Sequence, residues 1–293
     1  MEPASRPTLF GPAETRACRQ LIELALKEDL DSSGDVTSKA LIPADRLGQA
    51  VLIVRQAGVL AGLQAAELTF ACIDPALSFK PKRQDGSRLQ PGDQLALVQG
   101  SMGSILAGER TALNFLQHLC GIATLTQRYV DAIAGSRCRI LDTRKTIPGW
   151  RLLEKHAVRC GGGHNHRMGL YDGILVKDNH LAAMYPTLSI REVIERLCKP
   201  TMPLEIEVDT LDQLDEALAG NPDIILLDNM SPEKMREAVR RRNAVAPGVL
   251  LEASGGVTLE TVRALAETGV DRISVGALTH SAPALDIALD YLP

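Results

Sequence analysis

Aromatic side chains are scarce in this chain, at 3% of 293 residues with a single Trp. This scarcity argues against a stacking platform for single-stranded nucleic acid. A net charge of −4 and a pI near 5.9 argue against bulk nucleic-acid binding. No apolar run is long enough to span a bilayer, and the first sixteen residues lack the apolar segment of a signal peptide. We therefore expect no nucleic-acid partner, no membrane partner and a cytoplasmic location.

Closely spaced cysteine pairs are also absent. Free thiols in a cytoplasmic enzyme are the simplest interpretation of the scattered Cys18, Cys72, Cys120, Cys138, Cys160 and Cys198. Hydrophobic residues make up 45% of the chain and its mean hydropathy is close to zero. These values are typical of a soluble globular protein with a sizeable core, built as one large domain or two smaller ones.

The first hundred residues predict an α+β region with a mostly antiparallel sheet. Predicted helices cover Thr15–Leu30 and Leu63–Ile73. Predicted strands cover Gln49–Val54, Val59–Ala61 and, after a turn at Pro91-Gly92-Asp93, Gln94–Gln99. This region has no dense cluster of reactive side chains, so we interpret it as scaffold and substrate lid.

A long helical stretch follows over residues 103–134, with a possible break at Gly121. One face of this helix mixes apolar residues with Arg110 and two amides. Arg110 is either paired with Glu109 or solvated on a core helix, or it points into a functional site.

The pattern changes after residue 137, where short apolar runs alternate with segments of helical periodicity. The predicted strands are Cys138–Leu141, Gly173–Val176, Leu204–Val208, Ile224–Leu227, Val249–Leu251 and Arg272–Val275. The predicted helices are 149–160, 188–198, 210–219, 231–245 and 258–268. This alternation indicates right-handed βαβ units and a parallel sheet. The visible strands, with room for one more near 158–168, favour a closed α/β barrel, and an open doubly wound sheet is the alternative.

Polar residues occur at the carboxyl ends of these predicted strands, one strand after another. They are Asp142, Lys177, Glu207, Asp228, Glu252, Ser254 and Gly276. The carboxyl ends of barrel strands converge on one mouth, where active sites are built. Scattered surface polarity would not repeat this placement, so the pattern favours an enzyme over a structural protein.

The stretch from Asp142 to His180 is rich in cations, glycines and histidines. Residues 137–180 hold nine Lys and Arg against four Asp and Glu, and include four of the six histidines. The interleaving of cations with turn residues suggests the wall of a pocket for an anion with several negative groups. A basic surface patch explains the charge alone equally well.

The last two strand ends carry glycine-rich turns suited to phosphate. Ser254-Gly255-Gly256 precedes a helix expected to open at Thr258, and Ser274-Val275-Gly276 ends the last strand. Backbone N–H groups of such turns and helix N-termini bind anions. The two acids Glu207 and Asp228 suit Mg²⁺ or a developing positive charge. The combination fits a phosphate-bearing substrate that reacts through a cationic centre.

Several stretches of this chain resemble the quinolinate phosphoribosyltransferase family, also called nicotinate-nucleotide pyrophosphorylase (carboxylating). They include EDLDSSGDVTSKALIP, GERTALNFLQHLCGIAT, DTRKTIPGWRLLEKHAVRCGGGHNHRMGLYDGILVKDNH, LEIEVDT, IILLDN, EASGGV and ISVGALTHSAPALD. The resemblance implies an N-terminal α+β sandwich domain over 1–115 and an incomplete, seven-stranded α/β barrel over 116–280. The tail at about 281–293 is then expected to pack back on the N-terminal domain.

The resemblance also implies a reaction. Quinolinate and phosphoribosyl pyrophosphate give nicotinate mononucleotide, pyrophosphate and CO₂ in de novo NAD synthesis, with Mg²⁺ and no organic cofactor. The implied substrate-binding residues are Arg110, Arg144, Lys145, His166, Arg167, Lys177, Glu207, Asp228, Ser254, Gly255, Gly256 and Gly276. Lys145, Glu207 and Asp228 are the implied catalytic residues, and the two acids also hold Mg²⁺, partly through pyrophosphate. Arg110 is implied to reach the barrel mouth of a partner subunit, so that a homodimer shares its sites.

Three other interpretations remain at this stage. A metal hydrolase would use His164 and His166 with His156 or His180, although neighbouring cations repel a bound metal. A paralogous transferase of a molybdate operon would serve a different acceptor. A non-enzymatic phosphate-sensing barrel would leave Glu207 and Asp228 without a role.

Overall fold

The computed structural model describes residues 10–184, 188–197 and 201–292. In it the chain divides into two compact units. The first contains the described parts of Met1–Gln127 and Ala277–Pro293, together with Lys145–Gly162. The second contains Arg128–Arg144 and the described part of Gly163–Gly276.

Helix α4 (Met102–Ala132) runs without interruption through residues 115 and 116, where the sequence predicted a domain border. Two compact units separate after Gln127, and Lys145–Gly162 packs within the first unit, while the predicted domain border stays a prediction. The suggested break at Gly121 is wrong, because α4 continues through it. A Cβ atom at this position would lie 2.1 Å from the carbonyl oxygen of Pro283. The glycine therefore permits close packing of the C-terminal segment rather than ending the helix.

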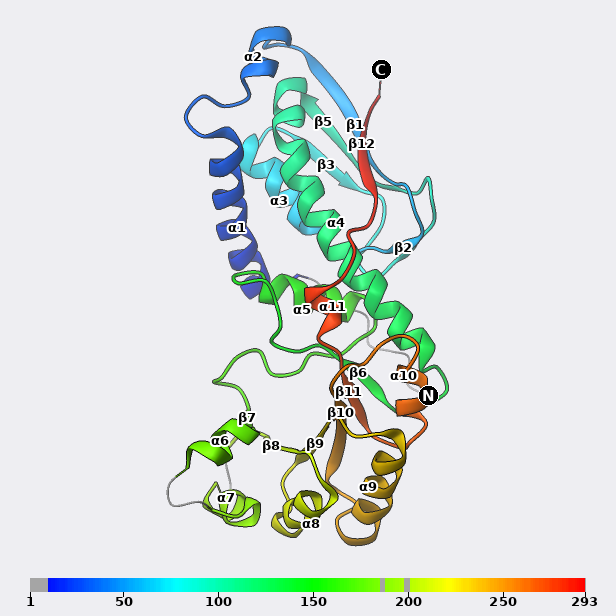
Figure 1. Cartoon of the computed structure of the whole chain (residues 1–293). Helices are drawn as coiled ribbons and strands as arrows, with labels where there is room; N and C mark the ends of the chain where they lie inside the picture. The colour runs from blue at the N-terminus through cyan, green and yellow to red at the C-terminus, as the bar shows by residue number, and fades with distance from the viewer. Residues whose placement is uncertain (1–9, 185–187, 198–200, 293) are drawn as a thin grey trace. The chain divides into compact units, whose positions relative to one another are not determined.

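A four-stranded antiparallel sheet forms the centre of the first unit, in the order β12-β1-β5-β3 (Figure 1). These strands are β12 (Ile287–Leu292), β1 (Leu47–Val54), β5 (Gln94–Ser101) and β3 (Ser78–Pro81). The short strands β2 (Gly58–Val59) and β4 (Arg88–Leu89) pair separately. The C-terminal residues therefore join the N-terminal sheet through β12, the placement expected for the tail.

The core of the first unit lies between this sheet and helices α3 (Leu63–Ile73) and α4. Alternate residues of β1, namely Ala50, Leu52 and Val54, share one buried cluster with Phe70 of α3 and Leu116 of α4. This spacing of two is the period at which strand side chains face one side of a sheet. The other helices of the unit are α1 (Pro12–Leu30), α2 (Val36–Leu41), α5 (Arg151–Cys160) and α11 (Ala277–His280).

A six-stranded parallel sheet forms the centre of the second unit, in the order β6-β11-β10-β9-β8-β7. The strands are β6 (Arg139–Leu141), β7 (Ile174–Val176), β8 (Leu204–Val208), β9 (Ile224–Asp228), β10 (Leu250–Ser254) and β11 (Arg272–Ser274). Strands β6 and β11, the first and last of this sheet along the chain, are neighbours. This is the cyclic order of a barrel, and it excludes a doubly wound sheet. A parallel bridge between Leu141 and His164 adds a short seventh position beside β6. The α/β barrel is thus the incomplete, seven-stranded form expected.

The helices of the second unit are α6 (Asp178–Ala183), α7 (Ile190–Arg196), α8 (Leu211–Gly220), α9 (Pro232–Val245) and α10 (Val262–Ala266) (Figure 1). Ser189, Thr210 and Ser231 cap α7, α8 and α9 through their side chains. Helix α6 was not predicted, and Cys198 at the end of predicted helix 188–198 lies outside the described residues.

Two predicted element bounds in the second unit need correction. Helix α10 begins at Val262 rather than at Thr258, because Thr258–Thr261 form a turn in which the Thr258 N–H donates to Thr261 Oγ1. Strand β10 extends to Ser254, so Glu252 lies inside the strand and is fully buried rather than following it.

The described cysteines, Cys18, Cys72, Cys120, Cys138 and Cys160, are all free, as predicted. In the described part of the chain, no helix combines the length and the apolar character needed to cross a membrane.

Candidate active site

Most of the predicted site residues lie at the carboxyl ends of the parallel strands of the second unit. Lys177 directly follows β7, Glu207 lies near the end of β8, and Asp228 and Ser254 end β9 and β10. Asp228 and Ser254 are paired in register across these two strands. The barrel topology therefore brings acids, a lysine and the glycine turn to one end of the sheet.

An ion pair joins two of these residues. The Lys177 Nζ lies 2.8 Å from Glu207 Oε2, with the carboxylate largely buried and the lysine half-exposed. A buried carboxylate is costly without a cation. Lys177 therefore supplies the positive charge that partners Glu207 at the strand ends.

The turn after β10 has a backbone that only glycine accommodates. Gly255 has φ +97°, and a Cβ there would lie 2.1 Å from Asn229 Oδ1. The Asn229 N–H donates to the Ser254 carbonyl oxygen at 2.9 Å, which ties this turn to the end of β9. The next residue, Gly256, also has positive φ, at +57°, and a Cβ there would meet open space. The turn therefore presents exposed backbone beside Asp228, as a phosphate site requires. The helix N-terminus expected at Thr258 is absent from it.

Two arginines approach each other at the same end of the sheet. Arg167 is half-buried, and its guanidinium donates to the Gly173 carbonyl oxygen at 2.9 Å. Burial lowers the pKa of Arg167, and the positive charge of Arg144 lowers it further. The negative charges of Glu205 and Asp172 act on this pKa in the opposite direction. Arginines near one another are a feature of anion sites. This proximity favours the anion pocket over a solvated basic patch.

The ring of His166 is engaged by protein groups at both nitrogens. Its Nε2 lies 3.0 Å from Glu205 Oε2 and 3.4 Å from Glu252 Oε1, and its Nδ1 accepts from the Arg167 N–H at 2.8 Å. Both ring nitrogens of His166 therefore contact protein groups, and its contact with substrate stays a prediction.

Opposing effects act on the charge of His166. Burial alone would lower the pKa of His166, but hydrogen bonds and negative charge from Glu205 and Glu252 outweigh it and raise the pKa to about 9. The bond that Nδ1 accepts from the Arg167 N–H acts the other way, since it needs a free lone pair on Nδ1. In the neutral ring, Nδ1 accepts this bond and the single ring proton lies on Nε2, facing Glu205. In the doubly protonated ring, Nε2 carries a proton as well, so Glu205 faces an N–H group in both states.

Glu205 and Arg272 are partners in this cluster that sequence reasoning missed, whereas Glu252 was expected at a strand end but not as a substrate-binding residue. Arg272 Nε lies 2.8 Å from Glu252 Oε2. Burial raises the pKa of Glu205, and the negative charge of Glu252 raises it further. Burial also acts to raise the pKa of Glu252, but the contacts with His166 and Arg272 outweigh it, so this pKa is lowered. One signal was available: Glu205 and Glu207 alternate in the strand LEIEV, so both face the same side.

Asp142 anchors the loop that carries His166 and Arg167. Asp142 is the residue that follows β6, and its side chain is fully buried. Its carboxylate accepts from the His166 N–H at 2.8 Å and from the Asn165 side chain. Asp142 therefore has a clear structural task here.

Arg110 and Lys145 belong to the first unit. Arg110 is exposed on α4, and within the described residues it forms no ion pair, not even with Glu109. The Lys145 side chain is also exposed, and its carbonyl oxygen accepts from Thr279 Oγ1 at 2.7 Å. Gly276, predicted for phosphate, follows β11 in the second unit.

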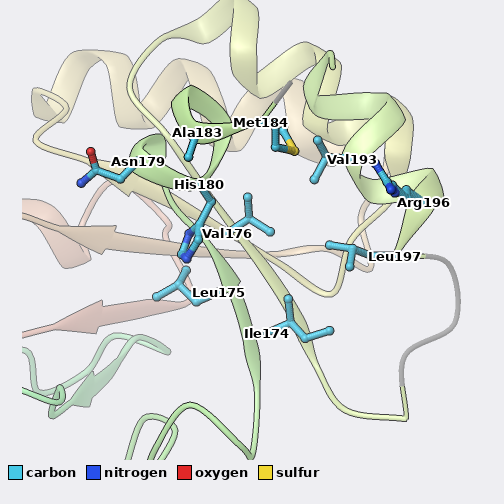
Figure 2. A pocket seen from close by; sticks show the side chains of 10 residues that line it. All are labelled: Ile174, Leu175, Val176, Asn179, His180, Ala183, Met184, Val193, Arg196 and Leu197. Atoms are coloured by element: carbon cyan, nitrogen blue, oxygen red, sulfur yellow. The ribbon is translucent and has the colours of Figure 1, made fainter. Parts of the chain in front are cut away.

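A cavity of about 520 Å³ lies beside β7, α6 and α7, apart from the charged residues described above (Figure 2). Apolar side chains make up most of its wall, as Figure 2 shows, among them Ile174, Val176, Met184 and Val193. Its polar lining residues are Asn179, His180 and Arg196. This cavity lacks the paired arginines and acids, so we place the anion site at the strand ends.

The histidines of the suggested metal hydrolase do not converge. His156 lies in the first unit, where its Nε2 is 2.8 Å from Asp85 Oδ2. Among the described residues, neither His164 nor His180 joins a group of potential metal ligands. His166 does sit with Glu205 and Glu252, but Arg272 already neutralises Glu252. Among the described residues, His156 and His166 belong to two separate groups of potential ligands, so the histidines of the hydrolase interpretation do not form one site.

Sequence models of known families match both halves of the chain. The model described as "Quinolinate phosphoribosyl transferase, C-terminal domain" matches residues 122–290, and that of the N-terminal domain matches 35–120. The chain belongs to the quinolinate phosphoribosyltransferase family.

Curated members of this family match over nearly the whole chain. The nicotinate-nucleotide pyrophosphorylase (carboxylating) of Mycobacterium leprae is 45% identical over 284 residues, covering 96% of this chain and 100% of that protein. The probable nicotinate-nucleotide pyrophosphorylase (carboxylating) of Bacillus subtilis is 39% identical over 272 residues, which are 93% of this chain and 92% of that protein. The similarity therefore extends through both compact units.

Solved structures of the family have the same fold. The nicotinate-nucleotide pyrophosphorylase from Francisella tularensis matches with a TM-score of 0.87 at 36% identity, over 94% of this chain and 96% of that one. NadC from Streptococcus pyogenes matches with a TM-score of 0.89 at 38% identity, over 98% and 100%. The N-terminal antiparallel sheet and the C-terminal parallel sheet are thus the family's architecture.

Proposed function

We propose that this chain transfers the phosphoribosyl group of phosphoribosyl pyrophosphate to quinolinate with loss of CO₂, giving nicotinate mononucleotide and pyrophosphate in de novo NAD biosynthesis. One observation carries the proposal: the paired Arg144 and Arg167 lie at the same strand ends as Glu207, Asp228 and the glycine turn. Family membership supports this reaction over the molybdate-operon paralogue and the phosphate sensor, since the matched families and relatives carry the quinolinate or pyrophosphorylase name.

Quinolinate has two adjacent ring carboxylates, which suit closely spaced guanidinium groups. We assign Arg144 and Arg167 to these carboxylates, because planar guanidinium forks bind carboxylates through two parallel hydrogen bonds. Lys145, next to Arg144 in sequence, and Arg110 of a partner subunit are the further cations that we assign to quinolinate. The mutual repulsion of Arg144 and Arg167 is relieved when the dianion binds, and this favours quinolinate over a monocarboxylate.

The phosphoribosyl donor is assigned to the other side of the strand ends. Its phosphate groups would bind the turn Ser254-Gly255-Gly256, Gly276 and Lys177. Glu207 and Asp228 would hold ribose hydroxyls and stabilise positive charge that develops on ribose as the bond to pyrophosphate breaks. Glu207 is suited to this task, because its carboxylate is largely buried at the strand ends and is paired with Lys177.

The reaction balances without an organic cofactor. The bond from ribose C1 to pyrophosphate breaks while the pyridine nitrogen forms the new bond to C1. The ring nitrogen then carries a positive charge, so the ring can take up the electron pair left when the adjacent carboxylate departs as CO₂. A proton finally replaces the carboxylate on that ring carbon. In this sequence, the residues of the chain bind, orient and neutralise charge.

The two acids also fit Mg²⁺. Glu207 and Asp228 offer carboxylate oxygens, the ligand type that Mg²⁺ prefers, and Asp228 is partly exposed at the end of β9. We therefore assign them to hold the ion, partly through the pyrophosphate. When bound, Mg²⁺ would neutralise charge on the leaving pyrophosphate.

Arg110 supports an assembly with shared sites. It is exposed on α4 and unpaired within the described residues, which leaves its charge available to an anion outside its own unit. We propose a two-fold dimer in which each Arg110 reaches the site of the partner subunit.

The test is quinolinate-dependent release of pyrophosphate and CO₂ by the purified protein with phosphoribosyl pyrophosphate and Mg²⁺. Nicotinate, which lacks the departing carboxylate, serves as the control acceptor. Equal or faster pyrophosphate release with nicotinate, or none with quinolinate, would overturn the proposal.

A matched pair of variants tests the anion site. We expect Arg167→Ala to lose about 30- to several-thousand-fold in kcat/KM for quinolinate, because a charge-assisted contact in a dry site is lost. Arg240→Ala, an exposed arginine on α9, is the control and should keep full activity. Near-normal quinolinate affinity in a folded Arg167→Ala protein would contradict the assignment of Arg167.

A further inference from the structure

Four buried or nearly buried charged side chains meet inside the second unit. His166 comes from the loop after the Leu141–His164 bridge, Glu205 from β8, Glu252 from β10 and Arg272 from β11. We call these four residues the inner cluster. Glu205 and Glu252 are 4% and 0% exposed, which separates them from the partly exposed Lys177 and Asp228.

Charges in the interior of an α/β barrel are unexpected, because branched aliphatic residues usually fill it. Removing a carboxylate from water is costly unless it is fully paired and hydrogen-bonded. Here compensation is incomplete: within the described residues, Glu205 Oε1 accepts no hydrogen bond. Apolar residues of similar size would stabilise the barrel at least as well, so stability alone does not explain the inner cluster.

The inner cluster contacts the loop that carries Arg167. His166 Nε2 lies 3.0 Å from Glu205 and 3.4 Å from Glu252, while Nδ1 of the same ring accepts from the Arg167 N–H at 2.8 Å. A single imidazole therefore links the buried acids to the main chain of the anion-binding arginine. Rotation of this ring would break the contacts on both sides at once.

Other hydrogen bonds hold the loop on either side of Arg167 but leave its own N–H to His166. The Asp142 carboxylate accepts from the His166 N–H at 2.8 Å. The Asp172 carboxylate accepts from the N–H groups of Met168 and Gly169 at 2.7 and 2.8 Å. The Arg167 guanidinium also donates to the Gly173 carbonyl oxygen at 2.9 Å, so the inner cluster supports the main chain of this residue while Gly173 contacts its side chain.

We propose that Glu205 and Glu252 are positioning residues that clamp the His166 ring, and that this ring fixes the Arg167 main chain so that its guanidinium meets a carboxylate of quinolinate. This inference rests on the proposed function.

Glu205→Gln is the direct test, since it keeps the size of the side chain and removes the charge facing His166 Nε2. We expect KM for quinolinate to rise about 10- to 100-fold, the range that a small displacement of a binding group produces. KM for phosphoribosyl pyrophosphate should stay within about twofold, because its assigned residues lie elsewhere. Glu267→Gln, which removes an exposed carboxylate paired with Arg263, is the matched control and should change neither constant.

A double-variant cycle tests whether Glu205 acts through His166. If it does, Glu205→Gln combined with His166→Asn should raise KM for quinolinate no more than His166→Asn alone. Multiplied effects of the two substitutions would contradict the clamp. A folded Glu205→Gln protein with a lowered melting temperature but unchanged KM for quinolinate would also overturn it and leave a purely structural role.

Misfolding of a variant and failure of the proposed function are distinguishable from failure of the positioning inference. If Glu205→Gln does not fold, Glu252→Gln takes its place with the same expected and contradicting results, because it removes the other carboxylate that faces His166 Nε2. If the unmodified protein releases no pyrophosphate with quinolinate, the proposed function fails. If that protein is active and both glutamine variants bind quinolinate normally, only the positioning inference fails.

Discussion

Asp228 is the residue whose charge should matter most for the chemical step. Its carboxylate accepts from the Asn229 side chain at 2.7 Å, while Ser231 caps α9. Ser231 rather than Asp228 therefore caps α9, and Asp228 lies beside Ser254 at the strand ends.

We expect Asp228→Asn to lower the rate of the chemical step more than the affinity for quinolinate. The lost charge acts mainly when positive charge develops on ribose, which is a property of the transition state. Single-turnover kinetics together with a quinolinate titration would measure the two effects. Asp209→Asn, on an exposed residue after β8, is a suitable control. An unchanged single-turnover rate would contradict the role of Asp228.

Gly255 offers a second prediction about a single residue. Gly255→Ala places a side chain at φ +97° and within 2.1 Å of Asn229 Oδ1, so the turn must shift. We expect a stability loss of about 1–3 kcal/mol and weaker binding of phosphoribosyl pyrophosphate. Thermal melting and KM for this donor would measure both. Gly248→Ala, where a Cβ meets open space, should be close to neutral. Unchanged donor binding in Gly255→Ala would remove the turn from the phosphate site.

The stability of helix α4 depends on how closely Gly121 packs against Pro283. Alanine usually stabilises a helix interior relative to glycine by about 1 kcal/mol. At Gly121, however, the new Cβ would lie 2.1 Å from the Pro283 carbonyl oxygen and 3.0 Å from its carbon. We expect Gly121→Ala to destabilise the protein by about 1–3 kcal/mol, since backbone must move.

Gly103→Ala in the first turn of the same helix is the matched control for Gly121→Ala. The nearest atom to its Cβ is Ser101 Oγ at 4.0 Å, so this substitution should be neutral or slightly stabilising. Chemical denaturation of the three proteins would compare them. If Gly121→Ala were stabilised as much as a free helix position, the close packing on Pro283 would not exist in solution.

Arg110 provides a test of how two copies of the chain assemble. If the site is shared across a two-fold dimer, Arg110→Ala should be inactive yet dimeric, and so should Lys177→Ala. Mixing the two with subunit exchange should restore about one quarter of the normal activity: half of the dimers are then mixed, and one of their two sites has both halves intact. Activity after mixing and sedimentation of each protein are the measurements.

Mixing two preparations of Arg110→Ala provides the control and should stay inactive. A mixture of Arg110→Ala and Lys177→Ala that remains inactive despite proven exchange would contradict the shared site. An active protein that sediments as a monomer would do the same.

Sequence alone was enough for the features that depend on short stretches of chain. The runs LEIEV and IILLD predict strands through β-branched and aliphatic residues, and the polar residues that end them mark one end of the parallel sheet. The stretch from Asp142 to His180 identified the family, which the family models confirm. Local patterns suffice here because strand and helix periods act over a few residues.

Tertiary structure alone decided how side chains meet across strands far apart in sequence. The direction of the His166 ring, its contacts with Glu205 and Glu252, and the pairing of Arg272 with Glu252 depend on the order and register of four chain segments. The continuity of α4 at Gly121 likewise depends on Pro283, more than a hundred residues later. Neither contact leaves a local pattern in the sequence, because the partner of each group is set by packing of the folded chain rather than by its neighbours along it.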